Sequence, residues 1–273
     1  MKDIIITPFS SKKLLDLSEI WRYRELLYIF TWRDIKVRYK QTILGILWVI
    51  FQPIVTMAIF TFFFGNLAKI SSGGLPYALF SLCGLVYWNF FSGALSHASD
   101  SMLTNESIIK KVYIPKIIIP LSSVITGFID YLINFFLLIF FALSLGYIPQ
   151  VSGLIIFPLG IILTMISAFG LCLFLSSFNV KYRDVRYILP FFIQILLFIT
   201  PVIYPLSIVS ERNRLIMALN PMTTVVELTR FVFSVNYKIY PHLIIISLLS
   251  SLVILMFGLW YFRKTEQFFA DVV

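Results

Sequence analysis

The sequence has few charged residues. Asp, Glu, Lys and Arg make up 13% of its 273 residues, whereas a soluble globular domain has about 25%. Hydrophobic residues make up 59% of the chain, and its mean hydropathy is +0.92. A chain this apolar cannot cover itself with polar groups in water. The composition therefore excludes an ordinary soluble domain and indicates an integral membrane protein.

Cysteine, histidine and the motifs of enzymes are also scarce. Cys83 and Cys172 each lie alone in an apolar segment, so we predict packing positions and no metal site. His97 and Asp100 could share a helix face, but one such pair at the end of an apolar run is more typical of interfacial solvation than of catalysis. The sequence contains no HExxH, GxSxG or GxxxxGK[ST] stretch. We expect no enzymatic activity, and any ATPase must be another chain.

Long uncharged runs are what the sequence has instead. A helix needs about 20 mostly apolar residues to cross a bilayer, and six segments satisfy this length. The runs show no alternation with a period of two, so we predict an all-α integral membrane fold. The six predicted spans cover residues 43–64, 77–96, 117–147, 154–178, 187–210 and 240–262.

Basic residues between the spans predict the orientation. If the N-terminus is cytoplasmic, 17 of the 22 Lys and Arg residues fall in cytoplasmic segments. The other five are Lys69, Arg212, Arg214, Arg230 and Lys238. Cytoplasmic loops retain cations, so we predict cytoplasmic N- and C-termini. Orientation also explains most of the net charge of +9, which therefore does not indicate nucleic-acid binding.

The cytoplasmic segment 1–40 contains an amphipathic pattern. One face carries Ile20, Tyr23, Leu26, Leu27 and Phe30 at helical spacing, and the polar residues Ser18 and Glu19 mark a helix start. A helix of this kind lies in the membrane interface. We therefore predict an N-terminal interface helix before the first span.

The loop 99–116 predicts a short cytoplasmic helix that begins at Thr104 or Asn105 and ends before Pro115. A helix held beneath the membrane is a natural docking surface for a cytoplasmic partner. The alternative is that this helix only closes the turn between two spans. The residues in question are Asn105, Glu106, Ile108, Ile109, Lys110 and Lys111.

The connection 211–238 is too polar to cross the bilayer and too apolar to remain free in water. Pro201, Pro205 and Pro221 divide this region into short pieces, and Glu227 and Arg230 can pair one turn apart. We predict re-entrant or outer helices here. Such backbone is tolerated where it packs on protein or lines a cavity.

Asp130 is the one acidic residue deep in a predicted span. An ionised carboxylate at mid-bilayer costs about 2.5–3.5 kcal/mol, so we expect a polar partner, with Asn134 one turn further along as a local candidate. Two roles remain open, one in a translocation path and one as a structural hydrogen bond inside the bundle.

Aromatic residues make up 17% of the chain. Most must face lipid or pack in the core. Some spans nevertheless mix indole and phenol rings into apolar sequence, and flat rings with a polar edge can let sugar faces slide past. The channel candidates are Trp48, Phe51, Tyr87, Trp88, Phe90, Phe91 and Tyr131, together with Asp130.

Four stretches carry a resemblance to a known family. They are "RYKQTILGILWVIFQP", "KKVYIPKIIIPL", "YRDVRYILPFFIQILLFITPVIYP" and "NPMTTVVELTR", in matching order from about Leu26 to Phe262. Together they resemble the permease subunit of ABC-2 polysaccharide exporters, which carry O-antigen, capsule and teichoic-acid precursors. The resemblance implies a single transmembrane domain over 1–273, in the bacterial cytoplasmic membrane.

The same resemblance implies a homodimer with two copies of a cytoplasmic ATPase, which holds the ATP and Mg. The interface helix and loop 99–116 would contact that ATPase, and residues 211–238 would form an outer gate. The cargo would be a glycan on undecaprenyl diphosphate. The alternatives are an ABC-2 permease for small hydrophobic drugs or lipids, and a membrane enzyme acting on lipid-linked sugars.

The stretch "RDIKVRYK" before the first span is a candidate cargo entrance. At 100° per residue, Arg33, Lys36 and Lys40 fall within about 60° of one another, and Arg38 points to the far side. A one-sided cationic face suits a diphosphate, whereas a simple tether to anionic lipid is the alternative. The entrance candidates are Arg33, Lys36, Arg38, Tyr39, Lys40, Thr42 and Gly45, with Leu44 and Gly45 allowing a tight turn.

Overall fold

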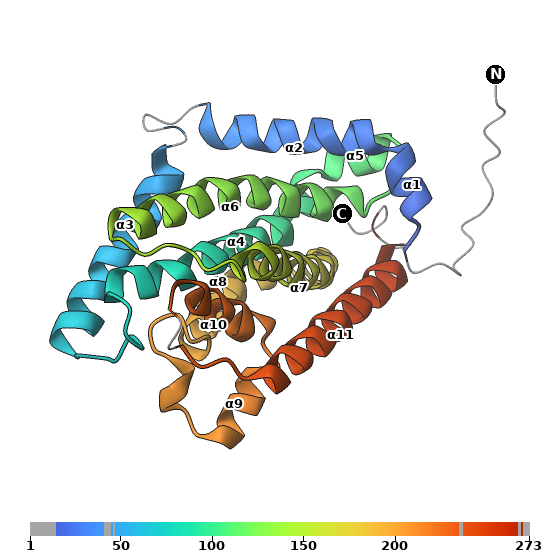
Figure 1. Cartoon of the computed structure of the whole chain (residues 1–273). Helices are drawn as coiled ribbons and strands as arrows, with labels where there is room; N and C mark the ends of the chain where they lie inside the picture. The colour runs from blue at the N-terminus through green and yellow to red at the C-terminus, as the bar shows by residue number, and fades with distance from the viewer. Residues whose placement is uncertain (1–14, 41–44, 46, 235–236, 267–268, 270–273) are drawn as a thin grey trace.

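A computed structural model describes residues 15–40, 45, 47–234, 237–266 and 269. Every regular element within these ranges is helical, in agreement with the predicted all-α fold (Figure 1). Among the candidate entrance residues, Thr42 lies outside the described residues, as does its neighbour Leu44.

The chain begins with two short helices at the predicted interface segment, α1 (Leu17–Arg22) and α2 (Arg24–Tyr39). Asp16, rather than Ser18, caps the first helix, because its carboxylate accepts hydrogen bonds from the backbone of Ser18 and Glu19 at 3.0 and 3.2 Å. The predicted apolar face is confirmed, since its five residues pack on one hydrophobic cluster of the bundle. Those residues are Ile20, Tyr23, Leu26, Leu27 and Phe30.

Within the described ranges, five helices are long and apolar enough to cross a membrane, or six if one bent pair counts as a span. The first joins α3 (Leu47–Phe60) to a π-helical continuation, η1 (Thr61–Leu67). The second runs on to Thr104, beyond the predicted end at residue 96. The other four are α4 (Tyr77–Thr104), α6 (Ile118–Ser144), α7 (Gly153–Lys181) and α11 (Pro241–Glu266).

The predicted fifth span, 187–210, differs most from the structure. Helix α8 (Val185–Ile199) has 15 residues, which is about 22 Å of helix and less than a 30 Å hydrocarbon core. Pro201 ends it, because a residue that precedes proline avoids the helical region; Thr200 is accordingly extended, with ψ of 134°. Residues 200–210 form turns and the 3₁₀ helix η2 (Leu206–Ile208).

The predicted outer connection forms two helices, α9 (Glu211–Met217) and α10 (Pro221–Phe233), which meet at 110°. The turn between them contains Asn220, whose side chain caps α10 by accepting from Met222 N at 3.1 Å, and Pro221 occupies the first turn. The predicted pair of short helices between the last spans is therefore present.

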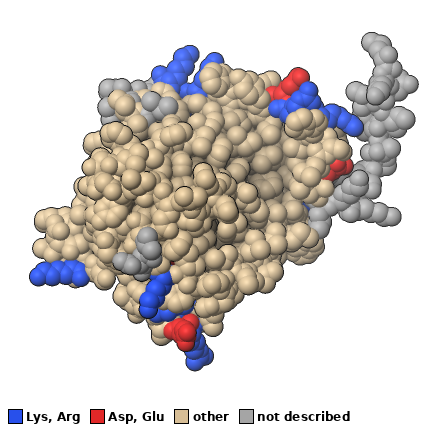
Figure 2. Space-filling model, viewed as in Figure 1, with Lys and Arg blue, Asp and Glu red and all other residues tan. Residues whose placement is uncertain are grey.

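Helix α4 lies at the centre of the bundle. Of its most apolar window, 78% is buried, against 11% for the Leu47–Leu67 span, so α3 leaves most of its surface uncovered by this subunit. Figure 2 shows the consequence: a broad uncharged surface, with Lys, Arg, Asp and Glu gathered near its opposite edges. Helices α1, α2 and α5 lie toward one charged edge and α9 toward the other.

Helices α7 and α11 cross at two glycines. A Cβ on Gly258 would lie 2.0 Å from the carbonyl oxygen of Gly170, and a Cβ on Gly170 would lie 2.7 Å from the backbone of Leu255. Only glycine allows the two backbones to approach this closely. Small residues at such crossings are the usual means by which membrane helices pack.

Candidate entrance, coupling and gate sites

Four of the predicted entrance residues, Arg33, Lys36, Arg38 and Tyr39, lie on α2, which packs along α6. Phe30 is buried at 4% exposure on the inner face, whereas Tyr28 and Trp32 are 65% and 47% exposed on the outer face. The two outer rings stack with centroids 6.4 Å apart, and the Lys36 ammonium lies 5.3 Å from the Trp32 ring. The outer face therefore presents aromatic rings and cations together, a pairing suited to a membrane interface.

The cations of the entrance divide between the two faces. Lys36 and Lys40 are exposed, one helical turn apart. Arg33 is partly exposed but bonded: it donates to Asp34 at 2.7 Å and to Asn105 at 2.7 Å, and it lies 4.8 Å from the Phe30 ring. Arg38 turns toward α6. The structure thus leaves Lys36 and Lys40 at the surface, and it bonds Arg38 to α6 and Arg33 to Asn105 between α4 and α5.

The partners of Asp130 lie on α2 and do not include the local candidate Asn134. Its two carboxylate oxygens accept one hydrogen bond from the Arg38 guanidinium and one from the Tyr39 hydroxyl, and Arg38 and Asp130 form an ion pair. Asn134 is not that partner, and its own Oδ1 is buried without a hydrogen bond among the described residues. Burial and the adjacent Asp130 raise the pKa of Tyr39 to about 12, so this phenol remains a donor at neutral pH.

The turn after α2 includes Gly45, which has a φ of +51°. This left-handed conformation disfavours residues with a Cβ, so glycine is suited to this position. The Gly45 carbonyl accepts from Trp48 N at 3.3 Å at the start of the first span, whereas Leu44 lies outside the described residues, so the tight turn stays a prediction. Trp48 and Phe51 follow in α3, 52% and 51% exposed, with ring centroids 5.6 Å apart.

The other predicted channel aromatics lie inside the subunit. Their exposed fractions are 5% or less, and they line the packed core around α4 and α6. The Tyr87 and Tyr131 ring centroids are 5.1 Å apart, and those of Phe90 and Tyr131 are 5.6 Å apart. In this conformation the rings contribute to packing rather than to an open surface. They are Tyr87, Trp88, Phe90, Phe91 and Tyr131.

The predicted loop helix is α5 (Glu106–Lys111). Asn105 occupies the position before it, but its side chain is used elsewhere: it donates to the Ser101 carbonyl at 2.7 Å and accepts from Arg33. Ile109 is buried at 6% exposure in the same cluster as Phe30, and Ile108 packs against that cluster. The inner face of α5 is thus anchored to the bundle and to α2.

The outer face of α5 is charged. Lys110 donates to Glu106 at 2.6 Å, and this contact lowers the pKa of Glu106. Lys111 is exposed, and Val112 and Tyr113 follow at 53% and 66% exposure. These residues form an uncovered surface beside α1, suited in chemistry to binding another protein.

His97 and Asp100 do not form the pair that their spacing allowed. Asp100 accepts instead from the Asn179 side chain at 2.9 Å and lies 3.8 Å from Arg186, which links α4 to α7 and α8. Among the described residues, no group of three or more His, Cys, Asp and Glu side chains could hold a metal ion.

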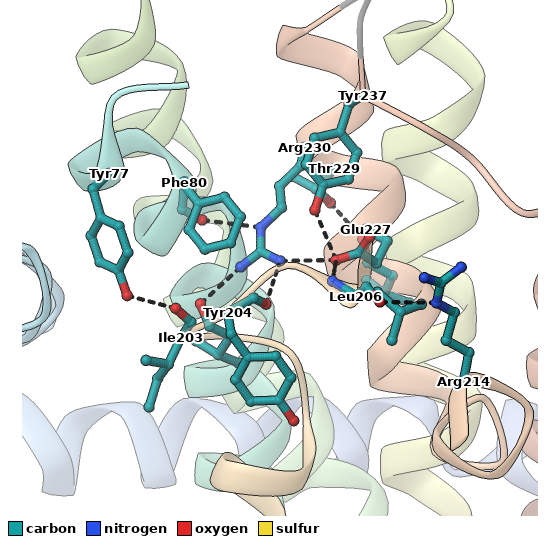
Figure 3. A network of polar contacts seen from close by, with 12 residues as sticks. Tyr77, Phe80, Ile203, Tyr204, Leu206, Arg214, Glu227, Thr229, Arg230 and Tyr237 are labelled. Carbon is teal, nitrogen blue, oxygen red and sulfur yellow. Dashed lines mark hydrogen bonds and ion pairs between the residues drawn. The ribbon is translucent and has the colours of Figure 1, made fainter. Parts of the chain in front are cut away.

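A buried polar network lies at the end of the bundle away from α2 and α5 (Figure 3). The predicted pair of Glu227 and Arg230 is confirmed at 3.0 Å, and Arg230 has an exposed fraction of 0%. Its guanidinium also donates to the carbonyls of Val202 at 2.8 Å and Phe80 at 3.3 Å, and its carbon lies 3.5 Å from the Phe80 ring. Arg230 therefore joins α10 to α4 and to the 200–205 turn.

Two tyrosines complete this network, and no sequence pattern identified them. Tyr237 donates to Glu227 at 2.9 Å, and Tyr77 donates to the Ile203 carbonyl at 2.6 Å. The Nε of Arg214, on α9, donates to the backbone carbonyls of Leu206 and Val209 at 3.0 and 2.7 Å. Most of the acceptors in these bonds are backbone carbonyl oxygens. Every residue has one, so the sequence alone does not show which of them accept a bond.

The fold and these sites define a polytopic helical membrane protein with a polar surface at each end and no phosphate-binding loop in its sequence. Residues 25–234 match the family model of ABC-2 type transporters. The chain belongs to this family, and it is a transport subunit rather than an enzyme.

Curated relatives align with most of its length. The chain is 28% identical over 250 residues to an O-antigen export system permease protein, RfbA, of Klebsiella pneumoniae, covering 91% of this chain and 95% of that protein. An RfbA of Myxococcus xanthus is 26% identical, with 79% and 82% coverage. The polysialic acid transport protein KpsM of Escherichia coli is 22% identical, with 86% and 91% coverage.

Proposed function

We propose that this chain is the membrane subunit of an exporter that carries a polysaccharide on undecaprenyl diphosphate across the bacterial cytoplasmic membrane. The observation that supports it most directly is that relatives named for O-antigen export and for polysialic acid transport align with most of the chain. These relatives favour a glycan over the small drugs or lipids that other ABC-2 permeases move.

The power for transport comes from a separate ATPase in this proposal. The chain has no GxxxxGK[ST] stretch, and it carries an uncovered surface at α5. Lys110, Lys111 and Tyr113 on that surface contact the ATPase. Because Asn105 at the start of α5 bonds to Arg33, a push on α5 is transmitted to α2. We place this surface and both termini in the cytoplasm, as the distribution of basic residues requires.

The transporter acts as a homodimer with two ATPase copies. The span Leu47–Leu67 supports this, since only 11% of its most apolar window is buried within one subunit. A translocation path between two copies is lined by surface residues of each. Trp48 and Phe51 are therefore the channel candidates that the structure leaves at the surface, and the buried aromatic residues support the walls behind them.

The exposed pair Lys36 and Lys40 makes the first contact with the diphosphate. Both ammonium groups extend from α2 immediately before the first span, and they are hydrated point charges that can attract a phosphate from the membrane surface. The cargo then passes beside Gly45 into the path between the two copies. The helices α9 and α10 form the outer gate through which it leaves.

Deletion of the gene tests the cargo. We expect surface polysaccharide to disappear while lipid-linked polymer accumulates in the cytoplasmic membrane, both measured by glycan electrophoresis after cell fractionation. Re-expression of the intact chain restores the surface polymer. As a control, a partner ATPase with its phosphate-loop lysine replaced should reproduce the deletion. Unchanged surface polysaccharide would contradict the proposal.

A further inference from the structure

The last two residues of α2 are bonded to an acid in the middle of another helix. Arg38 and Tyr39 both donate to the carboxylate of Asp130, which is 13 residues into α6. The side chains of Arg38 and Asp130 are only 23% and 19% exposed. An ion pair in this position joins the proposed entrance to a membrane-spanning helix.

The two donors match the needs of a phosphate group. A guanidinium and a phenol hydroxyl, held side by side, satisfy two oxygens of one anion, and both carboxylates and phosphates accept such bonds. Arg38 and Tyr39 therefore form an anion-binding position, and the carboxylate of Asp130, from the same chain, fills it. The geometry does not require the anion to be a carboxylate.

The neighbouring cations differ from Arg38. Lys36 and Lys40 are exposed, each two residues from Arg38 in sequence and on the other side of α2 from it, and Arg33 is committed to Asp34 and Asn105. A diphosphate that Lys36 and Lys40 attract to the outer side of α2 must therefore pass around the end of the helix, at Tyr39 and Lys40, to reach an arginine whose charge is already paired. Its two phosphates carry more negative charge than one carboxylate, so they compete well for the same guanidinium.

We propose that Asp130 is an internal competitor for the lipid diphosphate, and that cargo binding transfers Arg38 from Asp130 to a phosphate oxygen. This inference rests on the proposed function and adds regulation to its entrance. With Asp130 bound, the end of α2 is held against α6 and the entrance is closed to weak anions. The exchange removes the ion pair between α2 and α6 and so loosens the end of α2, and α2 is also tied through Arg33 to Asn105 beside α5.

The exchange gives the transporter a way to report that cargo is present. When Arg38 leaves Asp130, α2 loses its ion pair to α6 at one end and keeps the Tyr39 hydrogen bond to Asp130 there, while its contact with the α4–α5 junction at the other end is unchanged. Cargo at the entrance is thereby coupled to the surface that we assign to the ATPase. A ligand acts in this manner when it binds one of two states better than the other.

The test uses the full transporter with its ATPase, reconstituted in phosphatidylcholine nanodiscs. Undecaprenyl diphosphate is titrated, and the concentration that gives half-maximal stimulation of ATP hydrolysis is measured. Asp130→Asn should lower that concentration about tenfold, the factor expected if the competing contact is formed in about nine of ten molecules. Asp130→Leu removes the charge with a residue that favours the bilayer, and it should shift the titration in the same direction.

Variants that lack the donors to Asp130 show whether the effect of Asp130 depends on those donors. Arg38→Gln with Tyr39→Phe should raise the half-maximal concentration, and adding Asp130→Asn to this pair should bring no gain, because the competitor acts through these two donors. Asp184→Asn removes an exposed carboxylate from another loop and should leave the titration unchanged. A gain from Asp130→Asn that persists when both Arg38 and the Tyr39 hydroxyl are absent, or weaker binding in Asp130→Asn itself, would overturn the inference.

The outcomes separate this inference from the proposed function. If the gene deletion abolishes surface polysaccharide but Asp130→Asn and Asp130→Leu leave the titration unshifted, the internal competitor is rejected and the export function stands. If neither the intact transporter nor the Asp130 variants respond to undecaprenyl diphosphate, both the diphosphate entrance and its competitor are rejected.

Discussion

Arg230 is the most fully enclosed charge in the described part of the chain. Its guanidinium contacts one carboxylate and three backbone carbonyls, and its carbon lies over the Phe80 ring. A planar group with five donors can serve all of these acceptors at once, which a lysine ammonium cannot. The residue therefore holds α10, the 200–205 turn and the start of α4 in one arrangement.

Replacing Arg230 with Met should destabilise the protein by about 3–5 kcal/mol, because Glu227 would keep a buried charge without its cation. Thermal unfolding of the purified chain in detergent measures this loss. The double variant Arg230→Met with Glu227→Gln should recover part of it, since the second change removes the unpaired charge. Equal unfolding temperatures for Arg230→Met and the unchanged protein would contradict the assigned role.

Lys36 and Lys40 are the residues whose removal should affect cargo rather than folding. Changing both to Gln should raise the half-maximal concentration of undecaprenyl diphosphate about tenfold or more, since each cation near an anionic group contributes about 1 kcal/mol. Stimulated ATP hydrolysis in nanodiscs is the measurement. Membrane insertion should be unchanged, because both side chains are exposed.

The matched control for those lysines changes two cations at the other end of the molecule, Lys69→Gln with Arg212→Gln. Both side chains are exposed. This control should leave the titration unchanged. If Lys36→Gln with Lys40→Gln also leaves it unchanged, then these two lysines serve only to tether α2 to anionic lipid.

At the scale of elements, the crossing of α7 and α11 depends on the absence of side chains. A Cβ at Gly258 would meet the Gly170 carbonyl oxygen at 2.0 Å, and that oxygen belongs to backbone that cannot rotate away. The two helices must therefore separate if either glycine gains a methyl group. Separation weakens every contact along the crossing.

Gly258→Ala should lower the free energy of unfolding by about 1–3 kcal/mol, the usual cost of overpacking. Unfolding in detergent, followed by near-UV circular dichroism, reports it. Gly93→Ala is the control, because a Cβ at Gly93 meets no atom within 4 Å and alanine favours a helix. The control should be as stable as the unchanged protein or slightly more stable, and equal losses in the two variants would contradict this account.

At the scale of the whole molecule, the proposed translocation path lies between two copies of the chain, and Trp48 and Phe51 of each copy line its wall. Trp48→Ala with Phe51→Ala should reduce surface polysaccharide about fivefold, the factor that corresponds to about 1 kcal/mol of lost contact with passing cargo. Quantified glycan on whole cells measures it. The amount of folded protein should not fall, because both rings are about half exposed.

The control for the wall residues is Phe136→Ala with Phe140→Ala. These rings are 69% and 72% exposed on α6, so the same amount of aromatic surface is removed from another face. Export should continue at the normal level in this variant. Equal reductions in both double variants would mean that the rings act through lipid contact and not through the path.

The sequence could predict the features that follow from overall composition and from the spacing of residues close together in the chain. Composition alone requires a bilayer, and runs of about 20 apolar residues predict the five long helices. The i, i+3 spacing predicted the contact of Glu227 with Arg230, and the apolar face of α1 and α2 follows from helical periodicity. Each of these inferences uses residues within a few turns of one another.

The tertiary structure alone decided which distant groups meet. Asp130 pairs with Arg38, 92 residues away, and not with its local neighbour Asn134. It also decided that Tyr87 and Tyr131 are enclosed while Trp48 and Phe51 remain at the surface. An apolar environment requires that a buried charge find a partner, so the sequence by itself determined that Asp130 needs a cation or a strong donor. Packing of α2 along α6 determined which residues supply them.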